Sequence, residues 1–115
     1  MNRTLLILAS TALALTARAN REDGVPTRHN EATVAQLQAD MAAGRLSSKD
    51  LTREYIARIV GLDQHGPGVN SIIELNPDAL EMAEHADDLR RHGTVLGPLH
   101  GIPVLLKDNI DTGDR

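Results

Sequence analysis

Residues 97–112 read GPLHGIPVLLKDNIDT and place a single lysine, Lys107, directly after an apolar run. The run at residues 102–106, Ile-Pro-Val-Leu-Leu, is apolar at every position, which is typical of a strand covered on both faces. A lysine at the end of such a strand is drawn toward a buried cleft. Lys107 is therefore the first candidate for chemistry in this chain.

Two plainer interpretations of this stretch stay open at the level of the residues alone. Lys107 could be the ordinary charged end of an edge strand. Asp108 and Asn109 could cap the turn after the strand as well as orient the lysine. The glycines and prolines of the stretch are best explained as residues that shape the backbone.

The N-terminus has the features of an export signal. Residues 1–19 combine a short basic start, an apolar run at 5–15, and alanines at positions 17 and 19, which would be −3 and −1 to a cleavage site. The run is shorter than the about 20 apolar residues that span a bilayer comfortably. We expect a signal peptide cleaved after Ala19, a periplasmic or secreted product, and a flexible leader over the polar residues 20–32; a buried core helix is the alternative for residues 5–15.

The composition excludes several classes of function. The net charge is −4, and loss of Arg3 and Arg18 with the signal would make the chain more acidic, which argues against binding of nucleic acid or, after cleavage, of a membrane surface. The chain has no cysteine, and therefore neither disulfides nor thiol chemistry. Its one aromatic residue is Tyr55, so the core must be aliphatic and thin.

Two amphipathic helices are predicted after the leader. Thr33 and Gln36 have the spacing of a capping box, and the apolar stripe that follows runs to Gly44. Ser47 offers a second cap, and a second stripe follows it. The two stripes consist of Val34, Leu37 and Met41, and of Leu51, Tyr55, Ile59 and Leu62. We expect the two helices to pack as a pair on a larger body.

The second half of the sequence predicts a strand, a helix and a strand. Residues 69–75 contain two adjacent isoleucines and indicate a strand, and Asn76-Pro77 is typical of a helix start. The helix runs to about His92, ends at Gly93, and has alanines at 79, 83 and 86 on its inner face. With the strand at 102–106 this makes a βαβ unit, so the predicted fold class is α/β with a helical pair in front.

The stretch at 97–112 resembles the first catalytic motif of the amidase signature family of amide hydrolases, a Gly-Pro-Leu-x-Gly-Ile-Pro run followed by Lys-Asp-Asn. Upstream patterns resemble the family too: Gly-x-x-Ser at 44–47, in the turn after the first helix, Tyr-x-x-Arg-Ile at 55–59, and Asn-x-x-Ile-Glu-Leu-Asn-Pro-Asp-Ala at 70–79. The resemblance covers residues 33–115, which we interpret as the truncated N-terminal part of an amidase domain.

The resemblance implies a Ser-Ser-Lys catalytic arrangement: a nucleophilic serine, a bridging serine on a cis peptide bond, and a lysine base that matches Lys107. It places both serines in a Gly/Ser-rich segment beyond Arg115, together with the oxyanion donors. It implies a small-molecule amide as substrate and neither a metal nor an organic cofactor. We expect the isolated chain to be inactive, with Lys107 in solvent, and to be prone to aggregation at its uncovered apolar face.

Two other functions compete with the amidase hypothesis. A small secreted helical binding module would explain the signal and the helices, but it leaves residues 97–112 unexplained. The amidase subunit that transfers ammonia to charged transfer RNA shares the motif, but an export signal argues against it. The histidines lack the spacing of a metal site, and the acidic residues of the third helix have the pattern of a solvated face. The oligomeric state stays open.

Overall fold

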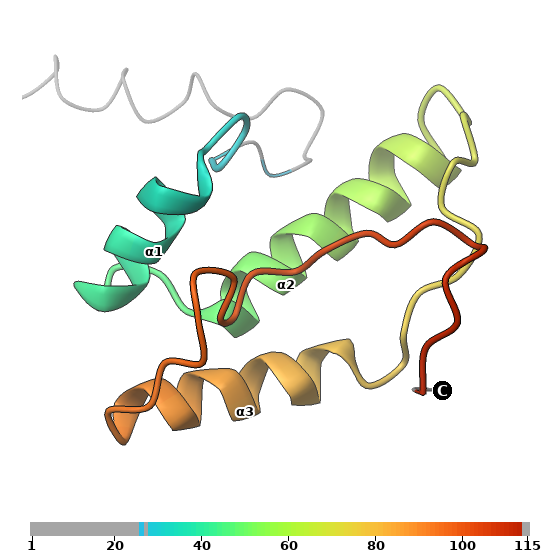
Figure 1. The fold of residues 1–115 in the computed structure, drawn as a ribbon. Helices are drawn as coiled ribbons and strands as arrows, with labels where there is room; N and C mark the ends of the chain where they lie inside the picture. Colours follow the sequence, from blue (N-terminus) through green and yellow to red (C-terminus); the bar gives the residue numbers. More distant parts are fainter. Residues whose placement is uncertain (1–25, 27, 114–115) are drawn as a thin grey trace, which may run out of the picture.

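The computed structural model describes residue 26 and residues 28–113, and in this part the chain forms three α-helices and one π-helical segment (Figure 1). The helices are α1 (Val34–Ala42), α2 (Ser48–Arg58) and α3 (Ala79–Arg91), and the π-helical segment η2 (Ile59–Gln64) continues α2. The predicted signal peptide and its cleavage site lie outside the described residues.

The first two helices begin where the sequence predicts. The Thr33 hydroxyl accepts the N–H of Gln36, and the Gln36 side chain accepts the N–H of Thr33, so the capping box is complete. Ser47 caps α2 by accepting the N–H of Asp50. Gly44 follows α1 with a φ of 69°, a conformation that glycine adopts without steric cost. Both helix starts are therefore confirmed.

The core lies between α1 and α2. Leu37, Met41 and Leu51 are buried in one cluster, and Leu51 is fully covered. Partly buried side chains complete it: Ala32, Leu46, Tyr55 and Ile102. The predicted pairing holds for Leu37 and Met41 of one stripe and Leu51 and Tyr55 of the other, whereas Val34 and Leu62 are exposed.

The third helix begins later than predicted and packs on α2. Asn76 accepts the N–H of Asp78 with its side chain and the N–H of Ala79 with its carbonyl, so residues 76–79 form a turn and the helix starts at Ala79. Ala83 is the buried residue of its inner face. The helix ends at Arg91 because Gly93 takes a φ of 82°.

The structure differs from the prediction at the two strand segments, since the described part of the chain contains no β-strand. Residues 69–75 and 102–106 carry strongly exposed side chains, including Ile73 and Leu105. A strand is defined by hydrogen bonds to a neighbouring strand, and neither segment has one here. The predicted βαβ unit therefore stays a prediction.

The end of the predicted leader contacts α2. Residues 28–31 form a turn, in which the His29 backbone N–H donates to Glu54 at 3.0 Å and the ring Nδ1 lies 2.6 Å from the other carboxylate oxygen of Glu54. Both side chains are about nine-tenths covered. None of the helices described is long and apolar enough to cross a membrane.

Candidate functional site

Lys107 ends an extended segment and begins a turn. The backbone of residues 102–107 has no regular secondary structure, and the Lys107 carbonyl accepts the N–H of Ile110 at 2.9 Å. Asp108 and Asn109 are the central residues of this turn, as one of the two sequence interpretations expects. The Lys107 side chain is exposed in the described chain.

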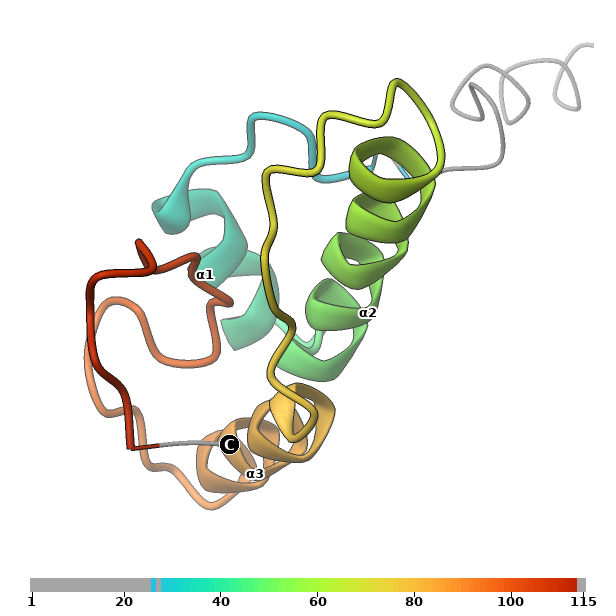
Figure 2. The same ribbon diagram turned by 90° about the vertical axis from the view of Figure 1, so that its right-hand side faces the viewer.

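The turn that precedes this segment is held by all three helices. In the sequence 97–101, the N–H of His100 donates to Gly97, and the N–H of Ile102 donates to Leu99. The Ser48 hydroxyl, at the start of α2, donates to the Gly101 carbonyl at 2.7 Å. We call residues 97–101 the motif turn; Figure 2 shows it in orange beside α1 and α3.

Gln38 of α1 and Arg90 of α3 bind the motif turn together. The Gln38 side-chain amide donates to the carbonyls of Pro98 and His100, each at 2.9 Å. Arg90 donates to the Gln38 side-chain oxygen at 2.7 Å and to the His100 carbonyl at 3.2 Å. The guanidinium thus fixes which end of the Gln38 amide faces the turn.

His100 is buried and connects the turn to α3. Its ring Nε2 lies 2.9 Å from the Ala86 carbonyl, and its Nδ1 accepts the N–H of Leu96 at 3.4 Å. Because Nδ1 accepts, Nε2 carries the proton and donates to Ala86. The ring is therefore a structural link between the motif turn and α3.

Asp87 shows that the acidic face of α3 is not uniformly solvated, which corrects the interpretation from sequence. Its two carboxylate oxygens accept the N–H groups of Ser48, at 2.7 Å, and Lys49, at 3.0 Å. These are the first N–H groups of α2, where the helix dipole favours a negative charge. The carboxylate thus caps α2 from a different helix.

Glu84 lies one turn before Asp87 on the same helix and forms an ion pair. The Lys49 ammonium donates to it at 2.7 Å, and this hydrogen bond together with the positive charge of Lys49 lowers the pKa of the Glu84 carboxyl. Since Glu84 is well exposed, the pair contributes little to stability.

The serines of the described chain are engaged in hydrogen bonds of the fold. Ser47 caps α2, Ser48 binds the motif turn, and the Ser71 hydroxyl donates to Asp63 at 2.5 Å. Each hydroxyl is thus committed to a carbonyl, a carboxylate or a helix end.

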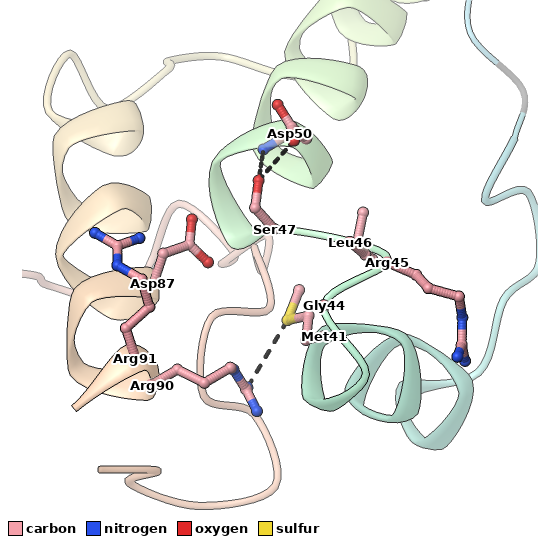
Figure 3. A pocket seen from close by; sticks show the side chains of 9 residues that line it. All are labelled: Met41, Gly44, Arg45, Leu46, Ser47, Asp50, Asp87, Arg90 and Arg91. Atoms are coloured by element: carbon pink, nitrogen blue, oxygen red, sulfur yellow. Dashed lines mark hydrogen bonds between the residues drawn. The ribbon is translucent and has the colours of Figure 1, made fainter. Parts of the chain in front are cut away.

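A pocket of about 250 Å³ lies between the turn after α1 and the C-terminal half of α3 (Figure 3). Arg90 points across it toward the sulfur of Met41, whereas Arg91 points away from Arg90. Lys107 does not line it. Within the described ranges, no three His, Asp or Glu side chains gather so as to hold a metal ion.

Comparison with known proteins matches the family model "Amidase" to residues 50–115. An amidase-family protein of Schizosaccharomyces pombe is 46% identical over 85 residues, which are 74% of this chain and 14% of that protein. One subunit of the glutamyl-tRNA(Gln) amidotransferase of Chloroflexus aurantiacus is 40% identical over 87 residues, which cover 75% of this chain and 17% of that relative.

The fold of this chain is similar to part of a solved amidase structure. The native peptide amidase of Stenotrophomonas maltophilia matches with a TM-score of 0.75 and 53% identity over 76% of this chain and 18% of that enzyme. The chain thus spans about a sixth of the length of these relatives. The region matched by the family model contains most of α2, all of α3, the motif turn and residues 102–107, which we call the lysine segment. This chain belongs to the amidase family.

Proposed function

We propose that this chain is the lysine-bearing part of an amidase that hydrolyses the C–N bond of a carboxamide through a serine acyl-enzyme. The observation that carries the proposal is the motif at residues 97–112, which lies inside the region matched by the family model. Lys107 is the proposed base. The alternative of a secreted binding module has no support in the family relationship.

The proposed reaction follows from the Ser-Ser-Lys arrangement that the motif implies. The nucleophilic serine attacks the carbonyl carbon, and its proton passes through the bridging serine to the amine of Lys107. The C–N bond then breaks, and the leaving nitrogen takes the proton as ammonia or an amine. Water attacks the acyl-enzyme by the same route and releases the acid.

Both serines and the oxyanion donors would come from the part of an amidase that follows residue 115. In such a protein the segments at 69–75 and 102–106 would pair as strands of one sheet, which completes the predicted βαβ unit. The exposed fractions of Ile73, 81%, and Leu105, 71%, support this, because apolar surface of that kind is normally covered.

Peptide amides are the substrate class to test first. The identity to a peptide amidase is 53%, against 40% to the amidotransferase, and this difference favours hydrolysis over ammonia transfer. Export of the protein, with cleavage of the signal peptide after Ala19, would also favour hydrolysis over ammonia transfer. The N-terminal sequence of the mature protein should then begin at Asn20.

The test incubates the complete gene product with a peptide carrying a C-terminal amide and measures ammonia. Release of ammonia with formation of the free acid is the expected result, with the isolated 115-residue chain as an inactive control. Ammonia release that requires charged transfer RNA would favour the amidotransferase instead. Absence of hydrolysis over a panel of peptide, aliphatic and aromatic amides would contradict the proposal.

A further inference from the structure

The motif turn is the anchored end of the lysine segment. Three carbonyls of this turn, those of Pro98, His100 and Gly101, accept hydrogen bonds from side chains of three different helices. Between Gly101 and Lys107, by contrast, the described part of the chain shows no hydrogen bond to the backbone of residues 103–106. In the described chain, the turn is therefore the only hydrogen-bonded anchor that fixes how far the segment lies along its own axis.

The register of residues 102–107 decides to which face of the segment the Lys107 side chain points. In an extended segment successive side chains point to opposite faces, so a slip by one residue moves every side chain to the other face. Residues 102–106 are apolar throughout and offer no polar side chain that would resist such a slip. Where this segment pairs as a strand, its backbone could form sheet hydrogen bonds in more than one register, so the contacts at the turn select the register of Lys107.

The geometry points to Gln38 and Arg90 as positioning residues that set the register of the Lys107 segment, an inference that rests on the proposed amidase function. Gln38 alone supplies donors to two carbonyls of the turn, and Arg90 orients its amide while binding one of the same carbonyls. An amide is required at position 38, because a carboxylate would bind Arg90 but would bring oxygens against the two carbonyls.

The test compares variants of the complete gene product in an amide hydrolysis assay. Gln38→Glu retains the shape, the helix and the Arg90 partner but removes both donors, and Gln38→Met removes them without adding a charge. Ala39→Glu is the matched control, since it places the same charge one residue further on an exposed position of α1. The concentration of folded enzyme is taken from the amplitude of the denaturant unfolding transition of each variant, so that kcat refers to folded enzyme.

We expect kcat to fall about 10- to 100-fold in both Gln38 variants, with KM changed less than about threefold, because a displaced base slows the chemical step. The midpoint of the pH dependence of kcat/KM should move in both, whereas Ala39→Glu should match the wild type. If Gln38→Glu fails to fold, Gln38→Met decides the test.

The proposal is overturned if the Gln38 variants keep the wild-type kcat per active site and the wild-type pH profile, even if less folded enzyme is obtained. In that case the turn contacts serve stability alone. Failure of the proposed function gives a different result, namely a wild-type protein that hydrolyses none of the amides tested.

Discussion

At the scale of single residues, the described chain depends on close contacts that tolerate little added volume. Gly101 has a φ of 76°, and a Cβ built on it would lie 3.1 Å from the Cβ of Ser48. Gly93 has a similar φ, 82°, but a Cβ there would meet nothing within 4 Å. Substitution of Gly93 by alanine would therefore add backbone strain alone, whereas substitution of Gly101 would add both strain and a close contact with Ser48.

Gly101→Ala should destabilise the protein more than Gly93→Ala. The left-handed conformation alone costs a non-glycine residue about 1–2 kcal/mol, and at Gly101 the displacement of Ser48 adds to this. Urea unfolding of the complete gene product measures both changes. Equal losses of unfolding free energy at the two positions would show that the contact with Ser48 is not crowded.

Residues that act locally could be predicted from the sequence, and those that act over a distance could not. Thr33, Ser47 and Gly44 were predictable because each satisfies backbone groups within a few positions of itself. Gln38 and Asp87 were not, because their partners lie 62 and 39 positions away. No local pattern distinguishes Asp87 from its exposed acidic neighbours.

At the scale of elements, α2 is stabilised from two directions. Ser47 caps it from within the chain, and Asp87 caps it from α3, so its first three N–H groups all have acceptors. The cap also joins α2 to α3, which positions Ser48 against the motif turn. Loss of this carboxylate should therefore loosen both a helix end and a helix contact.

Asp87→Ala should lower the free energy of unfolding by about 1–2 kcal/mol, since it leaves two N–H groups of α2 without an acceptor. Asp88→Ala is the matched control on the same helix; it removes only an exposed pair with Arg91 and should cost less than about 0.5 kcal/mol. Denaturant unfolding distinguishes the two. A cost at Asp87 no larger than at Asp88 would contradict the capping role.

Asp63 should make the loop after η2 sensitive to acid. The hydroxyl and the N–H of Ser71, and then the N–H of Ile72, donate to its carboxylate and lower the pKa of Asp63 below its usual value of 3.8. The ionised form is thus favoured in the folded state, so its stabilising effect is complete above the unfolded value and is lost as the pH falls through the lower folded one.

Hydrogen-exchange protection factors of Ser71 and Ile72, followed from about pH 5 to about pH 2, measure this effect. Protection should decrease at the acid end in the wild type. In Asp63→Asn it should be lower at about pH 5 and change little with acidification. Constant protection of the wild type over this range would exclude the role of the carboxylate.

At the scale of elements, the three predicted helices are present. The two predicted strands are not observed among the described residues. Each helix satisfies its own backbone, so its caps and stripe suffice to place it within about two residues. The segments at 69–75 and 102–106 have strand composition, but their hydrogen-bond partners are not within the described chain. Composition shows that a segment is suited to a strand, but the strand forms only when a neighbouring strand supplies its hydrogen bonds.

At the scale of the whole molecule, three helices hold one end of a segment whose other end carries Lys107. The apolar side chains of this segment, Val104, Leu105 and Leu106, are each more than half exposed. Lys107 itself was identified from its motif, while the network that holds the motif turn was visible only in the structure. The proposed chemistry needs the remainder of an amidase to cover this face and to bring serines to the lysine.

The most direct test of this account is the kcat/KM of Lys107→Arg in the complete gene product, with Lys49→Arg as control. Arginine keeps the charge but cannot lose its proton, so it cannot replace a base. We expect a loss of at least about 100-fold at Lys107 and less than about twofold at Lys49. Amide hydrolysis by Lys107→Arg at the wild-type rate would contradict the central claim that this lysine accepts the proton.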